Sequence, residues 1–65
     1  MGKRIKEMRE ELRMTQAELA RKLGFGQAYI ANIEAGERSV SPETIVKLTE
    51  IFGCTAGYIL GTEVV

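Results

Sequence analysis

Residues 16–34 read QAELARKLGFGQAYIANIE, and the spacing of the apolar residues in this stretch predicts two short helices. The break between them is Gly24-Phe25-Gly26. Glycine just past a helix end suits the left-handed backbone conformation that ends many helices, because it has no Cβ to oppose it. We therefore expect helices over residues 16–23 and 27–35, joined by a tight turn. The residues expected to face inward are Leu19, Ala20, Leu23, Ile30 and Ile33.

The segment before this pair predicts a further helix over about residues 3–13. Thr15 follows it as a candidate N-cap of the next helix, and Glu18, three residues later, completes the pattern of a capping box. The helix that starts near Gln16 therefore has a defined beginning. The residues expected on the apolar stripe of the first helix are Ile5, Met8 and Leu12.

The segment after residue 35 predicts two more helices. Ser41-Pro42-Glu43 is a strong helix start, because serine caps free amides, proline suits the first turn and glutamate favours the N-terminal dipole. Gly53 ends this helix, and Thr55 can cap a short fifth helix that Gly61 ends. The residues of the fourth helix expected to face inward are Ile45, Leu48 and Phe52.

These patterns predict an all-α fold of five helices in one domain over residues 1–65, since no segment alternates with the two-residue period of a strand. Hydrophobic residues make up 45% of the 65-residue chain, enough for one small core. No apolar run approaches the roughly 18 residues that a membrane span requires. The single cysteine, Cys54, cannot form a disulfide within the chain.

The residue types that catalysis needs are scarce. The chain has no histidine, one cysteine and no glycine-rich phosphate loop after a strand. Its carboxylates fall at the spacing of solvated helix surfaces, and so short a chain can hardly enclose a ligand pocket of about 300 Å³ or more. We therefore expect no enzyme activity, no catalytic residue, no metal ligand, no cofactor and no small-molecule site.

Charge is distributed unevenly along a chain whose net charge is zero. Residues 1–22 hold seven lysines and arginines against four glutamates, whereas residues 23–65 hold two against five. A basic N-terminal half on a neutral molecule can still present a face to phosphate groups.

The sequence around the tight turn resembles the helix-turn-helix domains of the phage Cro and repressor type, also called the xenobiotic-response-element-like family. The resembling residues are TQAELARKLGFGQAYIANIEAGER, preceded by IKEMREELRM and followed by SPETIVKLTEIFGCTAGYILG. The resemblance implies a lambda-repressor-like domain of five helices, with the helix-turn-helix at about residues 16–35. It also implies a bacterial or phage-like protein of the cytoplasm that binds double-stranded DNA and regulates transcription as a repressor.

The resemblance implies that the helix over residues 27–35 enters the DNA major groove. Gln27 matches the position that most often reads a base edge, and its amide suits adenine in a bidentate pair. Ala28 and Asn32 are the other candidate base readers. Family members commonly bind near-palindromic operators as homodimers, with half-sites about 34 Å apart. We expect a homodimer here too, weakly associated without DNA if the domain is isolated.

Further positions match contacts to the DNA backbone or architectural contacts. Gln16 and Arg38 match phosphate or sugar-phosphate contacts, and Tyr29 points outward in the same register, where its hydroxyl could reach a phosphate or a base. Arg9 and Glu34 match a pair that joins the first helix to the third.

Two alternatives stay open on the sequence alone. Glu37, next to Arg38, occupies a position where members of the resembling family commonly have a lysine or another polar residue. The negative charge of Glu37 would repel phosphate. The chain could therefore be an antitoxin-like or oligomerisation module that binds a protein partner on the same fold. It could also be a whole protein or the N-terminal domain of a longer repressor, because the segment after Gly61 resembles the point where longer repressors leave this domain.

Overall fold

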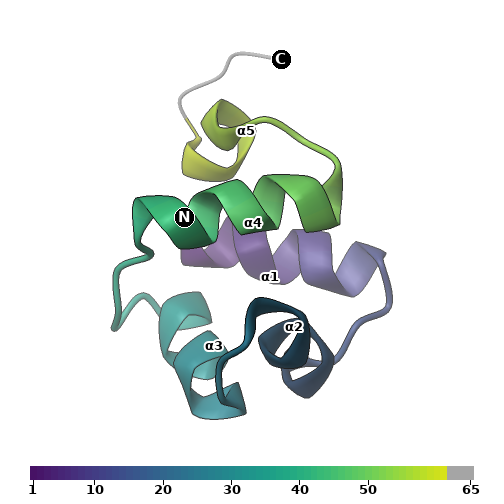
Figure 1. Ribbon diagram of the computed structural model, residues 1–65. Coiled ribbons are helices and arrows are strands. Elements are labelled where there is room, and N and C mark those ends of the chain that lie inside the picture. Colours follow the sequence, from purple (N-terminus) through teal and green to yellow (C-terminus); the bar gives the residue numbers. More distant parts are fainter. Residues whose placement is uncertain (62–65) are drawn as a thin grey trace.

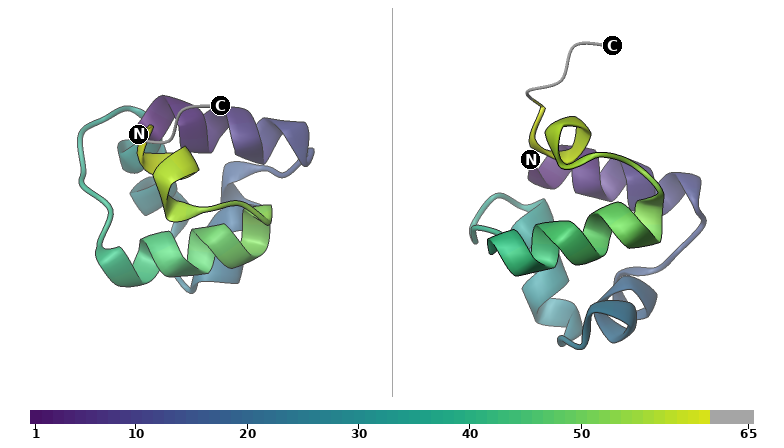
Figure 2. Two further views of the ribbon diagram at one scale, coloured as in Figure 1. Left: turned by 90° about the horizontal axis from the view of Figure 1, so that it is seen from above. Right: turned by 45° about the horizontal axis from the view of Figure 1, so that its top comes forward.

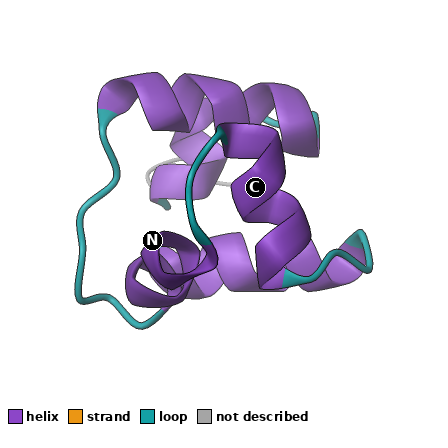
Figure 3. Ribbon diagram, turned by 60° about the horizontal axis from the view of Figure 1, so that its bottom comes forward, coloured by secondary structure: helices purple, strands orange, loops and turns teal. Residues whose placement is uncertain are grey.

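Five α-helices follow one another in the computed structural model, which describes residues 1–61 (Figure 1). No strand occurs in this part of the chain (Figure 3). The all-α, five-helix expectation is therefore confirmed, while residues 62–65 of the expected domain lie outside the described residues. The helices are α1 (Gly2–Glu11), α2 (Gln16–Leu23), α3 (Gln27–Glu34), α4 (Pro42–Phe52) and α5 (Ala56–Leu60).

The starts of α2 and α4 follow from the residues that cap them. The Thr15 hydroxyl accepts a hydrogen bond from the Glu18 amide at 3.1 Å, and the Glu18 carboxylate accepts one from the Thr15 amide at 3.0 Å. This is the reciprocal capping box that the sequence predicts. The Ser41 hydroxyl caps α4 by accepting a hydrogen bond from the Thr44 amide at 3.3 Å, with Pro42 in the first turn.

The first helix ends earlier than the sequence predicts, at Glu11 rather than near residue 13. Arg13 adopts a left-handed conformation with φ +56°, which turns the chain away from the helix axis. The prediction that Leu12 joins the apolar stripe is therefore wrong: Leu12 lies after the helix and is 50% exposed. Ile5 and Met8 are buried as expected.

The core gathers apolar side chains from all five helices. It includes each inward residue predicted for α2 and α3, together with Leu48 of α4 and Ile59 of α5. Ile45 and Phe52, also predicted to face inward, are half-buried and pack against this core. Val40 is a further core residue that the helical spacing did not indicate, and Thr44 is a buried polar residue near the start of α4. A core supplied by every helix fixes their relative positions, as burial of apolar area is the main stabilising term in so small a domain.

The α2–α3 pair lies at one end of the molecule and α5 at the other, with α1 and α4 between them (Figures 1 and 2). The end formed by α2 and α3 is therefore not covered by α5. None of the helices within residues 1–61 is long and apolar enough to cross a membrane.

The N-terminus of α1 packs closely against the end of α3 at Gly2. A Cβ atom at this position would overlap the carbonyl oxygen of Ile33 and lie 3.0 Å from that of Glu34. Both neighbours are backbone atoms at the end of a packed helix, so they have little freedom to move aside. Glycine at position 2 thus sets how closely α1 approaches α3.

We predict that Gly2→Ala lowers the free energy of unfolding by about 1–3 kcal/mol, the usual cost of adding a methyl group to a filled contact. Lys3→Ala, at the exposed neighbouring position, is the control and should stay within about 0.5 kcal/mol of the original chain. Urea denaturation followed by circular dichroism measures both. Unchanged or increased stability of Gly2→Ala would show that the contact is loose.

Candidate nucleic-acid interface

The turn between α2 and α3 depends on backbone hydrogen bonds and on the left-handed conformation of one of its two glycines. Gly24 has φ +81°, a conformation that glycine adopts without steric cost. The Phe25 amide donates to the carbonyl oxygen of Ala20 at 2.9 Å and the Gly24 amide to that of Arg21 at 3.2 Å, which satisfies the end of α2. Gly26 then caps α3 in an extended conformation, without a side-chain hydrogen bond. This arrangement fixes the angle at which α3 leaves the turn.

The two sides of α3 differ sharply in exposure. Ile30 and Ile33 are buried in the core, which anchors the helix. Gln27, Ala28 and Asn32 are exposed on the opposite side. The three candidate base readers therefore lie together on the free face of α3, at the uncovered end of the molecule.

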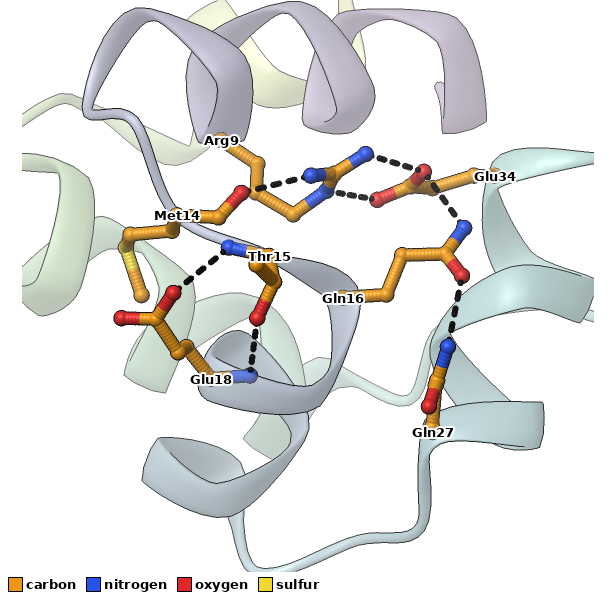
Figure 4. A network of polar contacts seen from close by, with 7 residues as sticks. All are labelled: Arg9, Met14, Thr15, Gln16, Glu18, Gln27 and Glu34. Carbon is orange, nitrogen blue, oxygen red and sulfur yellow. Dashed lines mark hydrogen bonds and ion pairs between the residues drawn. The ribbon is translucent and has the colours of Figure 1, made fainter.

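A buried ion pair joins α1 to the end of α3. The Arg9 Nε donates to Glu34 Oε2 at 2.7 Å and Arg9 Nη2 to Glu34 Oε1 at 3.1 Å (Figure 4). The two side chains are only 9% and 4% exposed. Hydrogen bonding to Glu34 raises the pKa of the Arg9 guanidinium, although burial acts in the opposite direction. Arg9 Nη1 also donates to the Met14 carbonyl oxygen at 2.6 Å, so this arginine holds both α3 and the chain before α2.

A chain of hydrogen bonds continues from this ion pair to the surface. Gln16 Nε2 donates to Glu34 Oε1 at 3.1 Å, and Gln27 Nε2 donates to Gln16 Oε1 at 3.4 Å (Figure 4). A carboxylate only accepts hydrogen bonds, so the amide nitrogen of Gln16 must face Glu34 and its oxygen must face Gln27. The amide nitrogen of Gln27 must then face Gln16. Through Gln16, the buried Glu34 carboxylate therefore favours one orientation of the exposed Gln27 amide.

The ring of Tyr29 in α3 contacts one side chain from each flanking loop, Phe25 before the helix and Arg38 after it. The Phe25 and Tyr29 rings lie 4.3 Å apart between centroids, with an angle of 24° between their planes. The Arg38 guanidinium carbon lies 4.7 Å from the centroid of the Tyr29 ring. Sequence reasoning named Tyr29 and Arg38 separately and missed Phe25. Aromatic residues four positions apart lie side by side on a helix, so the interval between Phe25 and Tyr29 could have indicated their contact. Phe25 precedes α3, however, and the helical spacing does not extend to it.

The structure brings the site residues into two groups. One group is the hydrogen-bonded network of Arg9, Glu34, Gln16 and Gln27. The second group is the contact of Tyr29 with Phe25 and Arg38. Ala28 and Asn32 contribute exposed side chains beside both. Within residues 1–61, no three cysteines, aspartates or glutamates gather as metal ligands would.

A tight turn between two short helices, the second with a free polar face, defines a helix-turn-helix domain. The chain belongs to the helix-turn-helix family, whose sequence model matches residues 5–59.

The chain is similar to curated bacterial and phage regulators over nearly all of its length. It is 35% identical to the HTH-type transcriptional regulator ImmR of Bacillus subtilis (strain 168), over 97% of this chain and 50% of that protein. It is 33% identical to the immunity repressor protein of Bacillus phage phi105, over 97% of this chain and 44% of that protein. The chain thus spans about half the length of these relatives.

Two solved structures have the same arrangement of helices. The P22 c2 repressor protein, in a crystal structure with synthetic operator 9T, superposes with a TM-score of 0.87 at 27% identity, over 95% of this chain and 94% of that one. The restriction-modification controller protein C.AhdI from Aeromonas hydrophila gives a TM-score of 0.80 at 29% identity, over 89% and 84% of the two chains.

We predict that Arg9→Met lowers the free energy of unfolding by about 3–5 kcal/mol, because it leaves the Glu34 carboxylate buried without its cation. The double variant Arg9→Met/Glu34→Met should lose less than Arg9→Met alone, as it removes the uncompensated charge. Urea denaturation measures both, and Lys6→Met, an exposed lysine on the same helix, is the control. A loss below about 1 kcal/mol for Arg9→Met would assign the pair a minor role.

Proposed function

We propose that this domain binds double-stranded DNA at defined sequences, with α3 in the major groove, and represses or otherwise regulates transcription. The observation that supports the proposal is the free face of α3, where Gln27, Ala28 and Asn32 are exposed opposite buried Ile30 and Ile33. The major groove of B-DNA is about 12 Å wide and admits one α-helix, and its base edges can be distinguished by side chains of these types. In this proposal the domain acts by binding and performs no reaction.

Gln27 is the principal base reader of the proposal, and adenine is the base that it selects. Because its amide nitrogen faces Gln16, its amide oxygen and remaining N–H are left for the DNA. Adenine offers an N6 donor and an N7 acceptor, which match one acceptor and one donor. Guanine offers two acceptors, O6 and N7, and would require the amide nitrogen in both positions. Ala28 is placed to contact a thymine methyl group, and Asn32 is a second reader one turn further along α3.

In this proposal Gln16 and Arg38 hold the domain on the sugar-phosphate backbone. Gln16 lies at the start of α2, where free amides and the helix dipole favour an anion. Arg38 is exposed in the loop after α3, where its guanidinium can reach a phosphate, and it lies over the half-buried ring of Tyr29. Such contacts fix orientation on the duplex and do not depend on base sequence.

Two copies of the domain acting together on a near-palindromic operator complete the proposal. Eight residues of α3 present few base readers, so one copy can specify only a short site. Two copies related by a two-fold axis would read inverted half-sites about 34 Å apart. The names of the similar proteins, among them an immunity repressor and a repressor crystallised with its operator, support both DNA binding and repression.

Selection of bound duplexes from a random DNA pool at defined salt tests the proposal. We expect an inverted repeat with half-site centres about 10 base pairs apart and one adenine that depends on Gln27. In Gln27→Ala, discrimination at that base should fall by about 1–3 kcal/mol while the other positions keep their preferences. Arg38→Ala is the contrast: it should weaken binding to all duplexes alike and reduce the salt slope by about one. Enrichment of no sequence, with tight capture of a protein partner instead, would favour an antitoxin-like module.

Gln16 provides a second, separate prediction. In Gln16→Met the Gln27 amide loses the neighbour that fixes its direction, while Glu34 keeps Arg9 as its partner. We expect the preference for adenine over guanine at the Gln27 position to fall by about 1 kcal/mol, the typical net value of one hydrogen bond. Competition binding with duplexes that differ at this one base measures the change. An unaltered preference would mean that the amide direction is set by the DNA alone.

A further inference from the structure

The Tyr29 ring is enclosed between an aromatic ring and a cation. Phe25 stacks on it at a centroid distance of 4.3 Å, which leaves no room for another group on that face. The guanidinium carbon of Arg38, 4.7 Å from the same centroid, must therefore lie over the opposite face. The three side chains come from the turn before α3, from α3 itself and from the loop after it. One ring thus connects the turn before α3 with the loop after it.

Arg38 differs from Arg9 in what holds it. Arg9 is bound by a buried carboxylate, whereas within residues 1–61 no carboxylate forms an ion pair with Arg38, including the adjacent Glu37. A guanidinium that lies over an aromatic face still has N–H groups at its edge that can donate to other acceptors. Arg38 is also exposed. Its position is fixed while its hydrogen-bond donors remain available.

The loop that presents Arg38 is tied to the same helix by its backbone. The Glu37 amide donates to the Asn32 carbonyl oxygen at 2.9 Å, and the Gly36 amide to that of Ile33 at 3.0 Å. These bonds place the Cα of residue 38 close to α3, but they leave the long arginine side chain with several rotatable bonds. The Tyr29 ring is the side chain over which the Arg38 guanidinium lies.

We propose that Tyr29 is a positioning residue: its ring, backed by Phe25, holds the Arg38 guanidinium in the orientation that meets a DNA phosphate. The inference rests on the proposed DNA-binding function and replaces a direct contact of the Tyr29 hydroxyl with an indirect role of its ring. Ordering a rotamer-rich side chain on binding is unfavourable, and the stack orders Arg38 before DNA arrives. Because a phosphate contact is independent of base identity, Tyr29 raises affinity for all sequences alike.

A double-mutant cycle on the DNA complex tests this role. Tyr29→Leu keeps apolar contact with the core but removes the ring face, and we expect affinity for every duplex to fall roughly two- to tenfold. Tyr29→Phe, which keeps the ring and loses only the hydroxyl, should bind as the original chain does. Tyr29→Leu/Arg38→Ala should bind no more weakly than Arg38→Ala alone, because the ring acts only through the arginine.

Proton chemical shifts of the free domain provide a readout without DNA. The Arg38 side-chain methylene protons should be shifted upfield by the Tyr29 ring, and the shift should vanish in Tyr29→Leu and persist in Tyr29→Phe. An absent shift in the original chain overturns the positioning role, as do additive losses in the cycle or a loss of affinity in Tyr29→Phe. If the shift is present and yet the original chain binds no duplex from the random pool, the DNA-binding proposal itself fails, and the positioning role with it.

Discussion

The buried ion pair between Arg9 and Glu34 is the interaction on which the rest of the arrangement depends. It joins α1 to the last residue of α3, and the same arginine bonds the Met14 carbonyl just before α2 begins. The first helix, the loop before α2 and the end of α3 therefore meet at one guanidinium. The desolvation of two charges is offset only when their hydrogen-bonding groups are well satisfied. Here the carboxylate accepts from both Arg9 and Gln16, and within residues 1–61 no buried side-chain nitrogen or oxygen lacks a partner.

The ion pair also gives direction to a polar contact at the surface. Amide side chains are symmetrical in shape but not in chemistry, so an isolated glutamine can present either its oxygen or its nitrogen to a ligand. The carboxylate of Glu34 removes that choice for Gln16, and the 3.4 Å bond to Gln16 favours one orientation of the exposed Gln27 amide. The buried ion pair thus influences which amide atoms α3 presents at its exposed face.

The elements could be predicted from the sequence where local chemistry decides them. The capping box at Thr15, the proline start at Pro42 and the glycine at position 24 act within a few residues, and each lies where expected. The end of α1 could not be predicted, since Arg13 takes a left-handed conformation without being a glycine. The Gln16–Gln27 contact and the Phe25–Tyr29–Arg38 stack depend on the angle between α2 and α3 and on loop geometry, which periodicity does not describe. The pairing of Arg9 with Glu34 was expected only through family resemblance.

Different kinds of interaction hold the two groups of side chains around α3. Hydrogen bonds hold the group of Gln16 and Gln27, and ring contacts hold the group of Tyr29 and Arg38. Hydrogen bonds are directional, so the network through Gln16 can fix which atom of Gln27 faces outward. Stacking on a ring face is less directional and leaves the edge donors of a guanidinium free, which suits a contact that needs only a positive charge in the right place. In the proposal, a change at Tyr29 would alter only how strongly the helix is held. A change at Gln16 would alter both what the helix selects, through Gln27, and how strongly it is held, and neither residue would need to touch a base.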